Sequence, residues 1–401
     1  MNILFLSLLD FSSLNERSIY TDLLRKFRDN GHVIYAVSPV ERRKSGETSL
    51  IDEDDCKILK LKIGNIQKTN YIEKGISLLT LQRQYIHGIN TYFPNVRFDL
   101  VLYATPPVTL CNVVKYVKEK YGAVTYLLLK DIWPQGMVDL GIISTRSPIY
   151  HYFRKKEKRI YAVSDYIGCM SENNVEYLSE HDSWLDANRI EVCPNSIEPV
   201  KPETISTETK NCLKDKYGIP KDKIIFLYGG NLGRPQGLDF LLQAIEQCED
   251  QECFFLIVGD GTEYQKIHDA VESMDSDKVK LIKYLPKEEY EQIVPISDVG
   301  LVFLNPCFTV PNIPSRILSY MQAALPMLAA TDRSTDLKRI FERADIGYWC
   351  LNGDTKAFLG NVEMLKDGET RRRMGLNSRE YLETNYTVQV CYDTIMKHMS
   401  D

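Results

Sequence analysis

The sequence predicts an α/β protein with two doubly wound parallel sheets, each flanked by helices. Short apolar runs that suit buried strands alternate with longer segments whose apolar residues recur at helical spacing. The alternation stops between residues 196 and 209 and then starts again. A chain of 401 residues is long enough for about two or three domains, each with its own core.

The first α/β unit begins at the N-terminus. Residues 3–7 and 33–37 predict strands, and between them Leu23, Leu24 and Phe27 share one face of a helix. Residues 41–55 are polar and charged, so we expect a loop there. Further strands are predicted at residues 56–63, 98–103, 124–129, 166–170 and 190–193.

The second unit follows a break rich in proline and polar residues. Pro199 and Pro202 cannot continue regular pairing, which favours a boundary after residue 198. Strands are then predicted at residues 224–228, 254–258, 279–282, 299–304 and 327–330. The stretch from about residue 370 to 399 predicts two helices. We expect an N-terminal domain at 1–198, a C-terminal domain at 199–375, and a helix at 376–401 that packs back on the first domain.

Composition excludes several classes of protein. Lysine plus arginine total 49 and aspartate plus glutamate total 55, and the net charge of −6 argues against coating nucleic acid. The ten cysteines form no Cys-x-x-Cys pair, which argues against a zinc site and favours a reducing, cytoplasmic location. The apolar N-terminus has no preceding basic region, so we expect a strand and not a signal peptide. No apolar run approaches the ~20 residues that span a bilayer, so we expect any membrane contact to be peripheral.

A glycine-rich segment at residues 228–237 follows the first strand of the second domain and precedes a helix. Gly229, Gly230 and Gly233 let backbone amides approach an anion, and a helix N-terminus adds partial positive charge. Arg234 adds a full charge. An ordinary strand-to-helix turn explains the segment equally well, because glycine-rich turns alone are weak signals.

A second candidate anion site lies in residues 310–316. Pro314 suits the first turn of a helix, with Asn312 or Ile313 near its cap. Ser315 and Arg316 would lie beside its free amides. The alternative is a proline-rich loop with Arg316 in a surface ion pair. Two anion-capable helix starts in one domain favour a diphosphate ligand.

Two further motifs lie in the first domain. At the end of a strand, Asp131 beside Lys130 and Trp133 could orient a sugar hydroxyl, although Trp133 could equally plug the domain interface. Residues 150–161 interleave basic and aromatic side chains at helical spacing, which suits an anionic membrane surface or an ordinary solvated helix face.

Taken together, these motifs resemble family-4 glycosyltransferases of the GT-B fold. The resemblance is greatest to the bacterial branch that builds capsular polysaccharide and O-antigen on lipid-linked acceptors. It covers nearly the whole chain. It rests on residues 19–24 and 31–33, Asp131-Ile132-Trp133-Pro134 with Leu140-Gly141, Cys193-Pro194-Asn195-Ser196, Tyr228-Gly229-Gly230-Asn231, Val258-Gly259-Asp260-Gly261, and Pro314-Ser315-Arg316 through Ala324-Leu325-Pro326.

The resemblance implies two Rossmann-like domains that face each other across a cleft. It implies retaining transfer of a hexose or N-acetylhexosamine from a nucleotide diphosphate sugar, UDP-linked, to an undecaprenyl-diphosphate-linked acceptor, without a metal or other cofactor. The implied catalytic residues are Lys130, Asp131 and Arg316. The implied nucleotide-sugar-binding residues are Gly230, Asn231, Arg234, Gly259, Gly261, Asn312, Ser315, Arg316 and Ser319.

The chain departs from the wider family at several of these positions. Pro311 and Ser319 occupy the places of two family glutamates, and Lys130 stands where histidine is common. Asn231 and Gln236 replace the arginine and lysine of the phosphate loop. Two alternatives therefore stay open: a catalytically silent nucleotide-sugar-binding partner of a transferase, and a nucleotide-sugar 2-epimerase. The second is disfavoured because the matching loops contain few acid or base groups.

Overall fold

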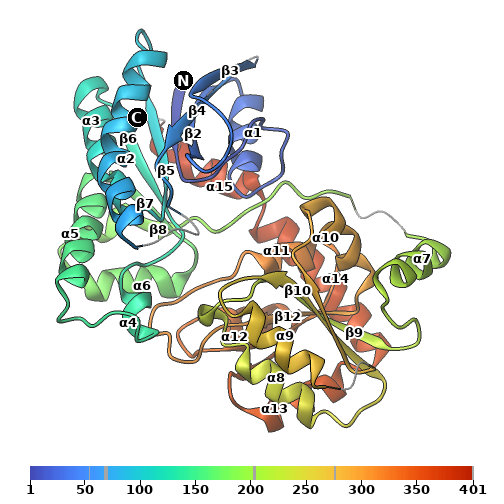
Figure 1. The fold of residues 1–401 in the computed structure, drawn as a ribbon. Coiled ribbons are helices and arrows are strands. Elements are labelled where there is room, and N and C mark those ends of the chain that lie inside the picture. The colour runs from blue at the N-terminus through green and yellow to red at the C-terminus, as the bar shows by residue number, and fades with distance from the viewer. Residues whose placement is uncertain (54, 67–70, 202–204, 275–276, 400–401) are drawn as a thin grey trace. The chain divides into compact units, whose positions relative to one another are not determined.

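The fold was obtained as a computed structural model that describes residues 1–53, 55–66, 71–201, 205–274 and 277–399. It divides into two compact units (Figure 1). Unit 1 comprises Met1–Glu198 and Thr387–Asp401, and unit 2 comprises Pro199–Tyr386. The chain returns to unit 1 later than the sequence suggests, because the long helix α14 (Gly368–Asn385) packs against helices of unit 2. Within the described ranges, no helix is both long and apolar enough to cross a membrane.

The sheet of unit 1 has the strand order β3-β4-β2-β1-β5-β6-β7-β8. Neighbouring strands are parallel except for β3, which pairs antiparallel with β4. The strands are β1 (Asn2–Leu6), β2 (Val33–Glu41), β3 (Ser49–Glu53), β4 (Cys56–Ile63), β5 (Leu100–Thr105), β6 (Val124–Leu129), β7 (Tyr166–Cys169) and β8 (Ile190–Val192).

The expectation of a loop at residues 41–55 is wrong for part of this stretch. Strand β2 continues to Glu41, and Ser49–Glu53 forms the edge strand β3. Leu50 and Ile51 are only partly buried, since an edge strand needs backbone pairing more than a continuous apolar face. A search for apolar runs therefore does not detect it.

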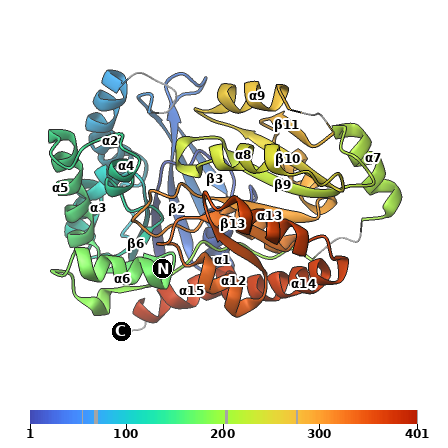
Figure 2. The same cartoon turned by 90° about the horizontal axis from the view of Figure 1, so that it is seen from below.

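Helices cover both faces of the unit 1 sheet. Helix α1 (Thr21–Asp29) and the C-terminal helix α15 (Val388–Met396) lie side by side and share one hydrophobic core with the sheet (Figures 1 and 2). Gly31 follows α1 with φ of 81°, so this turn requires a left-handed residue. The remaining helices are α2 (Tyr71–Tyr92), α3 (Cys111–Tyr121), α4 (Gln135–Asp139), α5 (Pro148–Val163) and α6 (Glu172–His181), with short 3₁₀ turns η1 (Val108–Leu110), η2 (Ala187–Arg189) and η5 (Lys397–Met399).

The sheet of unit 2 is parallel, with the order β11-β10-β9-β12-β13-β14. Its strands are β9 (Ile224–Asn231), β10 (Cys253–Asp260), β11 (Val279–Lys283), β12 (Val299–Phe303), β13 (Met327–Thr331) and β14 (Gly347–Leu351). The first strand, β9, lies between β10 and β12, so the direction of winding reverses between β9 and β12. Ligands of open α/β sheets bind at such a reversal, outside the carboxyl ends of the strands.

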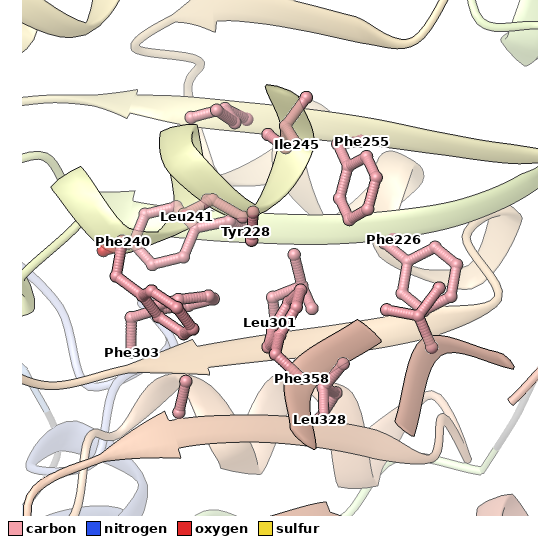
Figure 3. Close-up of a cluster of buried hydrophobic side chains, with 14 of the residues drawn as sticks. Phe226, Tyr228, Phe240, Leu241, Ile245, Phe255, Leu301, Phe303, Leu328 and Phe358 are labelled. Atoms are coloured by element: carbon pink, nitrogen blue, oxygen red, sulfur yellow. The ribbon is translucent and has the colours of Figure 1, made fainter. Parts of the chain in front are cut away.

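One face of the unit 2 sheet packs against α8 (Asp239–Gln247), α9 (Tyr264–Glu272) and α13 (Thr355–Met364). Figure 3 shows aromatic side chains meeting in this core, among them Phe303 and Phe358 with ring centroids 5.7 Å apart. The other helices are α7 (Thr207–Tyr217), α10 (Lys287–Ile293), α11 (Arg316–Gln322), α12 (Leu337–Ala344) and α14, with 3₁₀ turns η3 (Arg234–Gln236) and η4 (Val294–Ile296). The prediction of two helices at the C-terminus is confirmed by α14 and α15.

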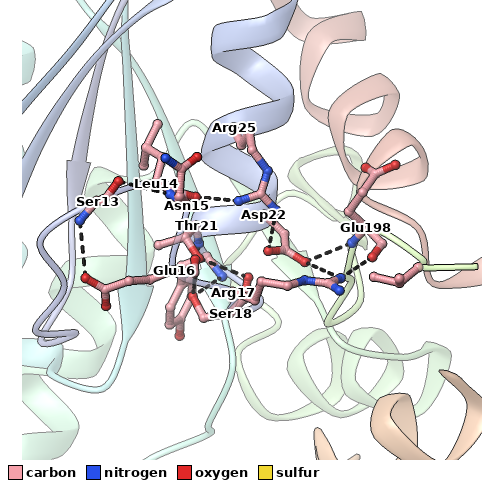
Figure 4. Close-up of polar contacts among 12 residues, drawn as sticks. Ser13, Leu14, Asn15, Glu16, Arg17, Ser18, Thr21, Asp22, Arg25 and Glu198 are labelled. Carbon is pink, nitrogen blue, oxygen red and sulfur yellow. Dashed lines mark hydrogen bonds and ion pairs between the residues drawn. The ribbon is translucent and has the colours of Figure 1, made fainter. Parts of the chain in front are cut away.

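A buried carboxylate ties the end of unit 1 to its first helix. Asp22 is 1% exposed, and its Oδ1 accepts a hydrogen bond from Arg25 Nη2 at 2.7 Å. Its Oδ2 accepts from the backbone amide of Glu198 at 3.0 Å and from Arg17 Nη2 at 3.4 Å (Figure 4). Nearby, the returning chain pairs with the outgoing one, since Ile197 and Thr387 form a parallel bridge. Asp22 therefore fixes the chain where it leaves unit 1.

We predict that Asp22→Ala lowers the free energy of unfolding by about 2 kcal/mol, because it removes a buried carboxylate that accepts hydrogen bonds from the Glu198 amide and from two guanidinium groups. The two arginines remain partly exposed, which limits the loss. Urea unfolding measures it. Asp29→Ala removes an exposed ion pair from the same helix and serves as the control, with a change within about 0.5 kcal/mol. Equal effects of the two substitutions would contradict the assigned role of Asp22.

Candidate functional site

Strands β9 and β12 separate where the sheet reverses its winding. They pair only through Val299 with Phe226 and Gly300 with Leu227. Beyond this point the Tyr320 hydroxyl lies between the two strands and accepts a hydrogen bond of 3.1 Å from the Gly229 amide. The same hydroxyl lies 3.1 Å from the Leu227 carbonyl and 3.3 Å from the Leu301 carbonyl, and it can donate to either. A buried side chain thus satisfies the backbone groups that the split would otherwise leave without partners.

The fit of Tyr320 depends on a glycine in β12. An ideal Cβ on Gly300 would lie 2.4 Å from the Tyr320 ring, so a larger residue would push the ring away. Tyr320 belongs to α11, whose first residue is Arg316. Residues four apart lie on the same face of a helix. Because the Tyr320 ring lies in the gap between β9 and β12, Arg316 lies at the open end of that gap.

Arg316 is held against the glycine-rich segment. Its Nη2 donates to Gln236 Oε1 at 2.6 Å, and its guanidinium carbon lies 4.4 Å from the centroid of the Tyr228 ring. Among the residues that the structure describes, its buried Nη1 has no hydrogen-bond partner. The group is a fixed cation with one donor edge that none of the described residues uses.

The glycines at the ends of β9 and β10 allow close approaches of the backbone. Gly230 has φ of 138°, and an ideal Cβ there would lie 3.2 Å from the Arg316 guanidinium carbon. Gly259 stands opposite Gly230 in the sheet, and its Cβ would lie 1.9 Å from the Gly230 carbonyl. A Cβ on Gly261 would meet the Leu232 carbonyl at 2.4 Å. These glycines bring strand ends together beside Arg316.

The segment after β9 differs from the expected direct entry into a helix. It forms the turn η3, and the helix α8 begins only at Asp239. Asn305 holds this turn, since its amide donates to the Pro235 carbonyl at 2.9 Å and its side chain to the Arg234 carbonyl at 3.0 Å. The side chains of Asn231 and Arg234 are exposed. Asn305 was missed from sequence because its role lies in a tertiary contact.

The expected helix start at Pro314 is also shifted. Helix α11 begins at Arg316, with Ser315 as its exposed cap residue. The Asn312 carbonyl accepts a hydrogen bond of 2.7 Å from Thr335 Oγ1. This bond anchors the loop before α11 to the segment after β13. Ser319 is partly buried in the first turn of α11. Of the residues predicted in this segment, Arg316 is the one that directly meets the glycine-rich segment.

In unit 1, Lys130 and Asp131 follow β6. The Lys130 ammonium donates to the carbonyl of Cys193 at 3.4 Å and to that of Pro194 at 3.2 Å. The Asp131 side chain is exposed, and its carbonyl accepts from Thr105 Oγ1 at 3.4 Å. Reduced hydration raises the pKa of the Asp131 carboxyl to about 6, and because the side chain still reaches solvent, we assign the shift no contribution to stability. Lys130 therefore joins two chain segments, whereas Asp131 remains accessible.

The basic and aromatic run forms α5, as its spacing predicts. Not all of its cations face solvent, because Arg154 forms ion pairs with Glu157 and Asp182, both buried. Burial raises the pKa of Glu157 to about 7 despite this arginine. Lys155, Lys158 and Arg159 are exposed. The exposed part of α5 is therefore less basic than the sequence alone suggests.

Comparison with known proteins finds a family model that matches most of unit 2. Residues 209–381 match the family described as Glycosyl transferases group 1. The chain is 23% identical over 355 residues to the probable glycosyltransferase WbjE of Pseudomonas aeruginosa, covering 86% of this chain and 84% of that protein. It is 19% identical to the putative colanic acid biosynthesis glycosyl transferase WcaI of Escherichia coli K12, covering 64% of each.

Solved structures share the architecture of the whole chain. A sucrose-phosphate synthase from Thermosynechococcus elongatus superposes with a TM-score of 0.76 at 15% identity, covering 99% of this chain and 98% of that one. HepE of Anabaena in complex with UDP-glucose has a TM-score of 0.72 at 14% identity, covering 100% and 99%. The chain therefore has the GT-B fold of two Rossmann-like domains, and within it residues 209–381 are similar to the family described as Glycosyl transferases group 1.

Proposed function

We propose that this protein is a retaining glycosyltransferase of surface polysaccharide synthesis, with a nucleotide diphosphate sugar as donor. The observation that carries the proposal is the fixed Arg316 guanidinium beside the glycine-rich end of β9, whose Nη1 has no hydrogen-bond partner in the part of the chain that the structure describes. A cation at the reversal point of a doubly wound sheet suits a diphosphate. The relatives WbjE and WcaI are named as transferases, WcaI in colanic acid synthesis, and the HepE structure contains UDP-glucose.

The proposed chemistry places Arg316 at the leaving group. When the bond between the sugar and the diphosphate breaks, negative charge grows on the phosphate oxygens, and a cation already fixed in place stabilises it without further reorganisation. Exposed Arg234 and Asn231 lie on the same segment and are proposed to contact the donor. UDP is the proposed nucleotide.

The proposed acceptor is a sugar on undecaprenyl diphosphate, held by unit 1. The accessible Asp131 carboxylate is proposed to orient the acceptor hydroxyl, and Lys130 to order the segment at Cys193 and Pro194 beside it. We further propose that unit 1 docks peripherally at the cytoplasmic face of the membrane through α5. Its exposed Ile149 and Tyr152 accompany the exposed basic residues of that helix.

A catalytically silent binding partner is the second candidate function, favoured by Pro311 and Ser319 at the positions of the two family glutamates. An assay of UDP release by the purified protein distinguishes the two candidate functions. A transferase releases UDP from a UDP-sugar, at least slowly to water, whereas a silent partner binds the nucleotide sugar without releasing UDP. A screen of nucleotide sugars by thermal shift first selects the donor, because ligands that bind only the folded state raise its melting temperature.

We predict that Arg316→Ala lowers kcat/KM for the selected donor by about 2 to 4 kcal/mol of transition-state stabilisation, as expected for the loss of a preorganised charge. Steady-state release of UDP measures the effect. Arg343→Ala, which removes an exposed arginine from the end of α12, is the control and leaves kcat/KM unchanged. Unaltered kinetics in the Arg316 variant would exclude this residue from the site.

We predict that turnover needs no divalent cation, because the Arg316 guanidinium is proposed to neutralise the diphosphate in the way that a metal would. Activity should persist after treatment with EDTA and should not rise when Mg²⁺ or Mn²⁺ is restored. Loss of activity with chelator and recovery with either metal would contradict the proposed mechanism.

We predict that the protein sediments with vesicles containing anionic lipid and that added salt weakens this binding. Each exposed basic residue near the surface contributes up to about 1 kcal/mol of attraction. The triple variant Lys155→Glu, Lys156→Glu, Lys158→Glu should sediment less.

The matched control places the same charge change on unit 2, with Lys210→Glu, Lys338→Glu and Lys356→Glu, all at exposed lysines. This control should sediment like the unmodified protein. Neutral vesicles should bind neither the control nor the unmodified protein. Equal sedimentation of both triple variants with anionic vesicles would show that α5 is only a solvated helix face.

A further inference from the structure

Gln236 contacts the cation of the candidate site directly. Its Oε1 accepts the 2.6 Å hydrogen bond from Arg316 Nη2 and lies 3.5 Å from the Tyr228 hydroxyl. We propose that Gln236 is a positioning residue that aims the Nη1 edge of Arg316 at the diphosphate of the donor. This inference rests on the proposed function for the identity of the ligand.

The guanidinium of Arg316 is restrained on three sides. Gln236 holds one nitrogen, the Tyr228 ring lies under the plane at 4.4 Å, and the backbone of Gly230 closes the third side. The Tyr228 ring is itself fixed, because it is fully buried and its hydroxyl donates to the Asn231 carbonyl at 2.8 Å. A long side chain that normally samples many rotamers is thus confined to one orientation before any ligand binds.

Gln236 itself is also fixed in place. Its backbone amide donates to the Gly233 carbonyl at 2.9 Å within the turn η3, and Asn305 anchors the same turn from the end of β12. The orientation of Arg316 is therefore set by the glycine-rich segment and not only by its own helix. A shift of this turn would move the cation with it.

The contact made by Gln236 assigns it an indirect role. Its amide oxygen accepts the hydrogen bond from Arg316 Nη2, so the contact that the structure shows for this side chain is with the cation; a direct contact with a phosphate oxygen would have to come from Gln236 Nε2, which the experiment below distinguishes. Arg316 Nη1, buried and without a partner among the described residues, is the donor left for the ligand. Gln236 therefore acts on the diphosphate through Arg316, as positioning groups do when they fix a charged side chain for binding.

A double-mutant cycle tests this role. The dissociation constants of UDP and UMP are measured by calorimetry for the unmodified protein, Gln236→Ala, Arg316→Ala and the double variant. We expect Gln236→Ala to weaken UDP binding roughly tenfold while UMP binding changes less than about twofold. In the Arg316→Ala background the same substitution should change UDP binding by less than about twofold.

The control variant is Gln265→Ala, which removes an exposed glutamine from α9 and should leave both dissociation constants unchanged. The proposal is overturned if Gln236→Ala leaves UDP binding unchanged. It is also overturned if Gln236→Ala weakens UDP binding equally with and without Arg316, because Gln236 would then contact the ligand itself.

A crystal structure of ligand-free Gln236→Ala supplies a second measurement that needs no nucleotide. We expect the Arg316 guanidinium to leave the face of the Tyr228 ring or to become disordered there. An unchanged, well-ordered guanidinium would refute the positioning role. If the unmodified protein binds no nucleoside diphosphate, the proposed function fails, yet this structure still decides whether Gln236 orients Arg316.

Discussion

The Tyr320 hydroxyl between β9 and β12 is the contact on which the candidate site depends. Two parallel strands that separate leave amides and carbonyls without ladder partners, and such groups are costly to bury. Tyr320 satisfies them from the side and is buried itself, with its ring against Gly300. Because Arg316 begins the same helix, the packing that closes the sheet also delivers the cation to the opening. One short helix thus carries both the side chain that fills the gap between the strands and the cation of the candidate site.

The glycines at the ends of β9 and β10 meet two packing requirements that a sequence pattern alone does not distinguish from ligand binding. Gly259 must let the carbonyl of Gly230 approach, and Gly230 must leave room for a guanidinium. Both are packing requirements that exist before any ligand binds. The same absence of side chains leaves backbone close to the Arg316 donor edge. A glycine pattern of this kind therefore indicates close backbone approach, and it indicates an anion site only when a cation such as Arg316 is shown beside it.

Sequence predicted most of the fold because a parallel strand buried on both faces, such as β6, is a nearly continuous apolar run, and because β4 keeps a buried apolar face between its lysines; the structure places both strands at the predicted residues. It missed β3 and β14, which are edge strands of their sheets and have few buried side chains. At the site, Arg316 was predicted from its helix-start motif. Gln236, Tyr228, Tyr320 and Asn305 gave no such signal, because their roles arise from contacts between segments far apart in sequence.

A neutral side chain at position 236 suits the position of Arg316. A lysine at 236 would place a second positive charge within hydrogen-bond distance of a guanidinium whose Nη1 is buried, where like charges repel more strongly than in water. A neutral acceptor removes this repulsion and also orients the Arg316 guanidinium. For a reaction in which charge grows on a departing group, a cation that is oriented before the reaction stabilises that charge without having to reorganise.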